Sequence, residues 1–202
     1  MPIMSGGGGT PHYTTIMGSI DGSNLLRELS KELGIDFRAD KPPLPALSIA
    51  LLLINHLFQG AGKIPIRKYW FASYQGSDKD HILYAKELRR LTFEPVLFKK
   101  HKGKEKGVDI ALATEMLVNA FNQNYDIGVL VAGDKDYAGL VKEVKRYGPI
   151  IHGAFFERGL SEDLVLAVDN FSDIIKKQNV NFDSDPWKKY ISEIQENLNQ
   201  NN

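Results

Sequence analysis

The spacing of apolar and polar positions changes repeatedly between residues 14 and 175, from short apolar runs to helical spacing and back. Short runs rich in β-branched residues and ended by glycine or polar turns predict strands buried on both faces. Apolar residues three and four apart predict helices. We expect strands over 14–20, 66–74, 94–99, 127–131, 149–156 and 171–175. We expect helices over 25–33, 46–59, 79–91, 107–121, 137–147, 160–168 and 186–198.

This alternation of strands and helices predicts an α/β fold, a three-layer α/β/α sandwich with a mainly parallel central sheet. We expect one domain over residues 14–175, preceded by a flexible leader over 1–13. Residues 176–202 are expected to form a polar linker, an amphipathic helix and a disordered tail. That helix can pack on the domain or join two copies in a homodimer.

Composition narrows the class of protein without deciding its partner. The 202 residues include 25 basic and 25 acidic side chains and no cysteine. A disulfide framework, a thiolate zinc site and a cysteine nucleophile are therefore excluded, whereas zero net charge leaves a nucleic-acid partner open. No apolar run approaches the roughly 20 residues that cross a bilayer, and the first residues lack the pattern of a secretion signal. We expect a cytoplasmic protein with no membrane partner.

Acidic residues follow the ends of two predicted strands. Asp134 and Asp136 come directly after the apolar run 127–131, and Asp21 follows the first strand. In open α/β sheets, ligands bind beyond the carboxyl ends of such strands. Two carboxylates this close repel each other unless a cation or a proton lies between them. The alternative is that Asp134 or Asp136 only caps the helix that follows.

A further acid, Asp109, lies in the first turn of the helix over 107–121, where it could also be only a cap. Because parallel strands end at a common edge, Asp109 can approach Asp21 and the acids after the central strand. Glu115 lies roughly 120° further around the same helix, so it is a second-rank candidate. Several carboxylates without histidine or cysteine suit Mg²⁺ or Mn²⁺ better than zinc.

A basic run precedes that helix and consists of Lys99, Lys100, Lys102, Lys104 and Lys106. Most charge runs are solvated loops, but beside an acidic metal site this one could hold a phosphate backbone. Asn24 could orient a carboxylate or a substrate group. Lys135, between the two acids after the central strand, could contact a phosphate or only solvent.

Three blocks together resemble the NYN domain, a branch of the PIN-like nuclease superfamily that includes the LabA-like group. They are Asp21-Gly-Ser-Asn24, Lys106-Gly-Val-Asp109-Ile-Ala-Leu-Ala-Thr-Glu115-Met-Leu and Val131-Ala-Gly-Asp134-Lys-Asp136-Tyr137. The resemblance, over about residues 14–156, implies a PIN-like fold and metal-dependent ribonuclease activity. It places Asp21, Asp109, Asp134 and Asp136 in the acidic site, with Ser23 and Asn24 on the substrate side.

The chain departs from the usual NYN pattern at three positions. It has Ala132 for serine, Tyr137 for phenylalanine and Glu115 for aspartate. None of these changes removes one of the four carboxylates that match the acidic site.

The leading hypothesis is a Mg²⁺- or Mn²⁺-dependent endoribonuclease that cleaves single-stranded or structured RNA. A non-catalytic RNA-binding or regulatory module of the same fold is the alternative. Other phosphoryl-transfer enzymes match less well. A haloacid-dehalogenase-like phosphatase needs aspartate where this chain has Ser23, and a Toprim domain needs glutamate where it has Asp21. No glycine-rich nucleotide-binding motif stands at a strand–helix turn.

Overall fold

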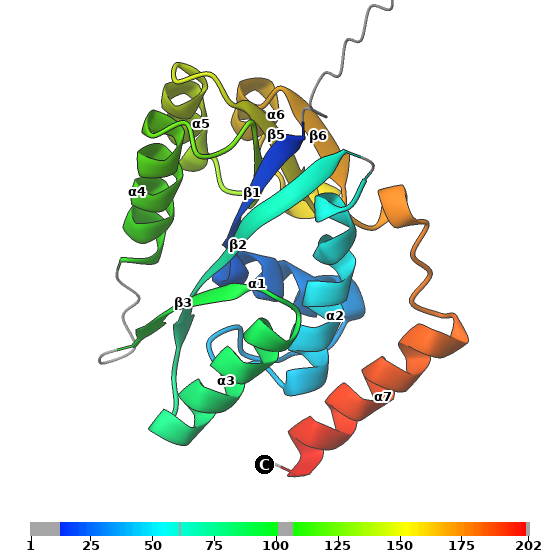
Figure 1. Ribbon diagram of the computed structural model, residues 1–202. Coiled ribbons are helices and arrows are strands. Elements are labelled where there is room, and N and C mark those ends of the chain that lie inside the picture. The colour runs from blue at the N-terminus through cyan, green and yellow to red at the C-terminus, as the bar shows by residue number, and fades with distance from the viewer. Residues whose placement is uncertain (1–12, 61, 101–106, 201–202) are drawn as a thin grey trace, which may run out of the picture.

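The computed structural model describes residues 13–60, 62–100 and 107–200 (Figure 1). The strands extend over Thr14–Asp21 (β1), Lys63–Tyr74 (β2), Glu94–Lys99 (β3), Ile127–Val131 (β4), Ile150–Phe155 (β5) and Asn170–Asp173 (β6). The α-helices extend over Gly22–Leu33 (α1), Leu44–Asn55 (α2), Asp78–Arg90 (α3), Val108–Phe121 (α4), Tyr137–Lys145 (α5), Glu162–Ala167 (α6) and Asp185–Gln200 (α7). Short 3₁₀ turns lie at His56–Phe58 (η1), Glu157–Gly159 (η2) and Lys176–Gln178 (η3).

All six strands are parallel, in the order β3-β2-β1-β4-β5-β6. From β1 the chain winds outward through β2 to β3, crosses back to β4, and winds outward the other way. The strand order therefore reverses between β1 and β4, where an open α/β sheet leaves a crevice for ligands. The predicted α/β fold is confirmed.

Helices cover both faces of the sheet, which completes the three layers (Figure 1). One apolar core joins α1, α2 and α3 to the sheet and includes Trp70 and Phe155. The other core joins α4, α5 and α6 to the opposite face and includes Phe71 and Leu130. Because neighbouring residues of a strand point to opposite faces, Trp70 and Phe71 belong to different cores.

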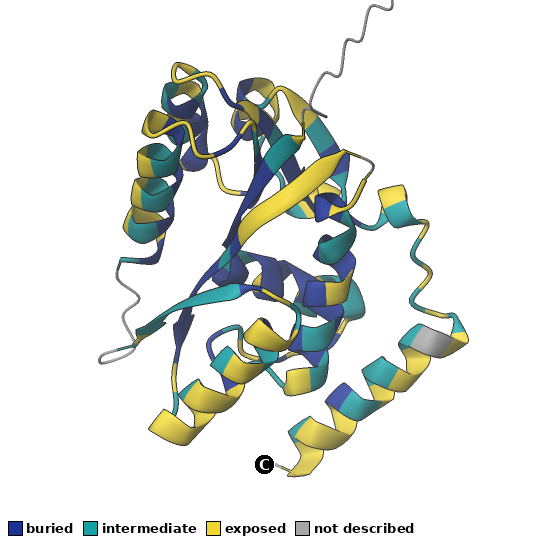
Figure 2. Ribbon diagram, viewed as in Figure 1, coloured by how far each residue is buried: buried dark blue, intermediate teal, exposed yellow. Residues whose placement is uncertain are grey.

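The start of β2 differs from the expectation. The strand begins at Lys63, three residues before the predicted start, although its first five residues are exposed (Figure 2). Pairing with β3 begins only at Tyr69, so this first part has a neighbour, β1, on one side only. Pro65 lies in this stretch. An edge position tolerates a proline that cannot donate to a strand ladder, and a proline inside an apolar run counts against a strand in pattern analysis.

The C-terminal helix α7 packs on the domain. Ile194 is fully buried, and Trp187, Tyr190 and Ile191 pack against the core on the α2 side of the sheet. The apolar side of α7 is therefore packed against the domain of the same chain. Within the described ranges, no helix combines the length and the apolar character that crossing a membrane requires.

Candidate functional site

Two of the predicted acidic turns lie at the carboxyl ends of β1 and β4, where the strand order reverses. Asp21 is the last residue of β1, and the turn from Ala132 to Asp136 joins β4 to α5. The strand register pairs Ile20 of β1 with Val131 of β4, so the two strands end at the same level of the sheet. The fold thus brings together residues that are more than a hundred positions apart.

Among the described residues, Asn24 and Tyr137 each donate a hydrogen bond to the Asp21 side chain. Its side chain is buried, and Oδ1 accepts the backbone N–H of Asn24 at 2.9 Å, which caps the start of α1. Oδ2 accepts the hydroxyl of Tyr137 at 2.9 Å. Asp21 therefore caps α1 and also contacts Tyr137 at the carboxyl edge, so a capping role does not exclude a place in the candidate site.

Tyr137 links Asp21 to Asp109. Tyr137 is the first residue of α5 and is 4% exposed. Its hydroxyl lies 2.9 Å from Asp21 Oδ2 and also 2.9 Å from Asp109 Oδ1. Burial raises the pKa of the Tyr137 phenol far above its ordinary value, and the negative charges of Asp21 and Asp109 raise it further. The phenol therefore stays protonated. Its single O–H proton can be donated to only one carboxylate at a time, so Asp21 and Asp109 share one donor.

Asp109 reaches the site from the first turn of α4. Its side chain is exposed, whereas its neighbour Val108 is buried and fixes the start of the helix in the core. The cap residue of α4 is Gly107, with a φ of +90° that favours glycine. The Asp109 carboxylate lies 2.9 Å from the Tyr137 hydroxyl.

The turn after β4 is fastened to α1. Asn24 Oδ1 accepts the backbone N–H of Gly133 at 3.0 Å, and the carbonyl of Gly133 accepts the N–H of Ser161 at 2.9 Å. Asn24, predicted to orient a carboxylate or a substrate group, therefore sets the position of the acidic turn itself.

The two acids of that turn lie at the surface. Asp134, Lys135 and Asp136 are all exposed. Asp134 Oδ1 accepts the backbone N–H of Asp136 at 3.1 Å, while Asp136 makes no side-chain cap bond to α5. Asp134 thus supports the turn locally, and both carboxylates face the solvent; we call Asp134 and Asp136 the rim acids.

The donor set at this edge suits a hard divalent cation. Within the described residues, no three His, Cys, Asp or Glu side chains form a group that could hold a metal ion by themselves. Asp21 and Asp109 nevertheless converge on one hydroxyl. A Mg²⁺ ion is commonly bound through only one or two carboxylates, with waters and substrate phosphates completing the shell. A carboxylate has about four lone-pair positions, so a carboxylate oxygen that accepts a hydrogen bond can also bind a cation.

Three other predicted site residues have partners away from the acid pair. Ser23 is buried, and its Oγ accepts the backbone N–H of Ser73 in β2 at 3.0 Å. Lys99 pairs with Asp78 at 3.1 Å, and Lys100 pairs with Asp40 at 2.9 Å. The predicted residues Lys102, Lys104 and Lys106 lie outside the described residues.

Glu115, the second-rank acid, faces β2 rather than the acid pair. Its Oε1 accepts the side-chain amide of Asn119 at 2.8 Å. Burial raises the pKa of Tyr69 to about 12, and a hydrogen bond to Glu115 contributes to this shift. The contacts of Glu115 therefore join α4 to the sheet.

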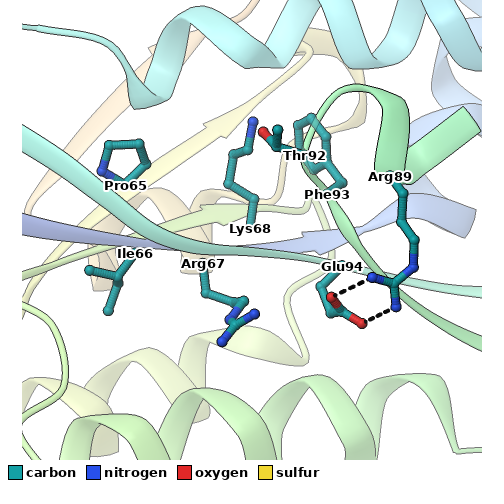
Figure 3. Close-up of a pocket in the computed structure, with 8 residues that line it drawn as sticks. All are labelled: Pro65, Ile66, Arg67, Lys68, Arg89, Thr92, Phe93 and Glu94. Atoms are coloured by element: carbon teal, nitrogen blue, oxygen red, sulfur yellow. Dashed lines mark hydrogen bonds and ion pairs between the residues drawn. The ribbon is translucent and has the colours of Figure 1, made fainter.

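A cavity of about 260 Å³ lies at the opposite edge of the sheet, beside the start of β3 (Figure 3). Two of the cationic side chains that line it, Arg89 and Lys68, already have partners. Arg89 forms a two-point ion pair with Glu94, at 2.7 and 3.3 Å. Lys68 donates to Asn55 Oδ1 at 3.0 Å and lies 4.2 Å from the centre of the Phe93 ring. Since neither of the converging acids lines this cavity, we place the functional site at the carboxyl edge.

The comparison with protein families covers the part of the chain that contains these residues. The model of the NYN domain matches residues 17–175, which include the end of β1, the start of α4 and the turn after β4. The protein belongs to the NYN domain family. The resemblance carried by the three sequence blocks is thereby confirmed, and the parallel sheet of this NYN domain is consistent with a PIN-like fold.

A solved structure supports the fold of this NYN domain. A protein of unknown function from Vibrio parahaemolyticus RIMD 2210633 superposes with a TM-score of 0.62 at 20% identity, over 82% of this chain and 98% of that chain. A protein from Parabacteroides merdae ATCC 43184, provisionally named an oxidoreductase, gives a TM-score of 0.36 at 8% identity over 85% of this chain and 31% of that one. This second similarity carries no argument. No curated protein matches the chain.

Tyr137 is the site residue that the sequence patterns did not assign. It was visible only as a departure from the phenylalanine that NYN sequences usually have there. A tyrosine directly after two acids, at the start of an apolar helix, was the available signal. Tyr137 contacts Asp109 only because α4 and α5 lie side by side, and the sequence pattern does not predict how these two helices pack.

Proposed function

We propose that this NYN domain is a metal-dependent endoribonuclease with its nuclease unit over residues 14–175. The observation that carries the proposal is the convergence of Asp21 and Asp109 on the Tyr137 hydroxyl at the point where the strand order reverses. Membership in the NYN family, a PIN-like group associated with ribonuclease activity, makes RNA the expected substrate.

In this proposal Asp21 and Asp109 hold Mg²⁺ or Mn²⁺, and the exposed Asp134 and Asp136 complete the acidic rim. Such a cation lowers the pKa of a bound water and neutralises charge on a phosphodiester group. The protein's own part is to hold the carboxylates in place. Asn24 fixes the acidic turn through Gly133.

The substrate backbone would follow the basic residues near this edge. Lys135 is exposed between the two rim acids, so its ammonium group can meet a phosphate without breaking a described ion pair. Lys99 and Lys100 would have to exchange Asp78 and Asp40 for phosphate oxygens. The salt dependence of RNA binding reports how many such contacts form, because each neutralised phosphate releases counterions.

The test is cleavage of labelled single-stranded and hairpin RNA with Mg²⁺, Mn²⁺ or EDTA. We expect cleavage with either metal and none with EDTA. A circular RNA, which has no ends, should also be cut if the enzyme is an endonuclease. Asp134→Asn should reduce the rate, because the rim loses a charge while the turn keeps a hydrogen-bond acceptor for Asp136.

Two results would contradict this proposal. Cleavage that persists in EDTA would mean that the metal-dependent mechanism is wrong. RNA binding with no cleavage under any metal condition would instead identify a binding or regulatory module of the same fold.

A further inference from the structure

One buried phenol contacts both carboxylates of the candidate metal pair. The Tyr137 ring lies in the core formed with α4 and α5, together with Met17, Phe71 and Val108. Because the ring is packed on all sides, the position of its oxygen is fixed by the fold. That oxygen lies 2.9 Å from a carboxylate oxygen of β1 and 2.9 Å from one of α4.

The two carboxylates depend on this phenol to different degrees. Asp21 is buried and is also held by the N–H of Asn24. Asp109 is exposed, and among the described residues its carboxylate has no hydrogen-bond donor except Tyr137. An exposed aspartate without such a bond samples several rotamers, and like charge would turn it away from Asp21. The phenol is therefore what holds Asp109 in place.

We propose that Tyr137 is a positioning residue, which holds Asp109 against Asp21 so that one divalent cation can bind both carboxylates. This inference rests on the proposed function. Partners that orient metal ligands typically change metal affinity by about 10–100-fold when they are removed. The hydroxyl acts through Asp109 and does not itself need to touch the cation or the RNA.

A purely structural role is the competing explanation, and the chain contains a matched control for it. Tyr125 is buried in the same core, and its hydroxyl donates to the backbone carbonyl of Met116 at 3.1 Å. Tyr137→Phe and Tyr125→Phe each remove one buried phenol oxygen and leave the ring. Only the first removes a donor to an acidic side chain.

The experiment is a Mn²⁺ titration followed by the electron paramagnetic resonance signal of the free ion, without RNA, on wild type and both variants. We expect Tyr137→Phe to weaken Mn²⁺ binding by about 10-fold or more and Tyr125→Phe to leave it within about 2-fold of wild type. Near-ultraviolet circular dichroism checks that both variants are folded.

Each outcome separates this inference from the proposed function. Wild type that binds no Mn²⁺ would overturn the metal site itself. Wild type that binds, with Tyr137→Phe equal to it or tighter, would overturn the positioning role alone. Equal weakening by both variants would show a general effect of core disturbance and would also overturn it.

A second measurement does not depend on the folding of the variants. In wild type labelled with 3-fluorotyrosine, the ¹⁹F resonance of Tyr137 should shift when Mg²⁺ is added, and that of Tyr125 should not. A Tyr137 resonance that does not respond to saturating metal would contradict the proposal.

Discussion

Replacing Asp109 by asparagine is expected to reduce metal-dependent RNA cleavage by about 100-fold or more, because losing one metal ligand removes several kcal/mol of transition-state stabilisation. The fold should be unaffected. Asp109 is exposed, and the asparagine oxygen can still accept the Tyr137 hydroxyl. The measurement is the initial cleavage rate of labelled RNA in Mn²⁺.

Asp163 provides the control for this variant. It is also an exposed aspartate in the first turn of a helix, α6, and none of its described contacts reaches the acid pair. Asp163→Asn should cleave RNA at the wild-type rate. If Asp109→Asn retains most of the activity, the metal centre has been placed on the wrong carboxylates.

Replacing Gly133 by alanine is expected to destabilise the protein by about 3 kcal/mol or more, because overpacking a fixed site forces the backbone to move. A Cβ at this position would lie 2.1 Å from the backbone oxygen of Gly159 and 2.4 Å from the Phe155 ring. The turn cannot shift easily, since Asn24 and Ser161 hold its N–H and carbonyl. Urea unfolding measures the change in free energy.

Gly139 is the matched control, six residues further along the chain. It is exposed within α5, and a Cβ there would meet no atom within 4 Å. Gly139→Ala should therefore stabilise the protein by about 0.5–1 kcal/mol, through helix propensity alone. If Gly133→Ala is as stable as wild type, the tight contact between this turn and η2 is not a constraint on the fold.

The sequence was sufficient to predict the order of strands and helices, because their periodicity is a local property. The apolar run at 127–131 became β4, and the acids after β1 and β4 lie at the predicted edge. The position of Asp109 near Asp21 was also predicted, since a crossover helix starts at the carboxyl edge of the sheet.

The contacts that complete the site could not be predicted, because they join distant parts of the chain. Tyr137 and Asp109 are 28 positions apart, and Asn24 and Gly133 are 109 apart. No periodicity encodes which side chains meet when α4 packs beside α5. The partner of Lys100, Asp40, lies in a proline-rich loop whose path only the fold determines.

The most direct test of the account is the position of the metal in crystals grown with Mn²⁺ and measured for its anomalous scattering. We predict a peak within about 2.0–2.3 Å of oxygens from both Asp21 and Asp109, the usual length of bonds to hard cations. A peak bound only by the rim acids Asp134 and Asp136, or none beside Asp21 at saturating Mn²⁺, would contradict the claim that Asp21 and Asp109 form the metal centre.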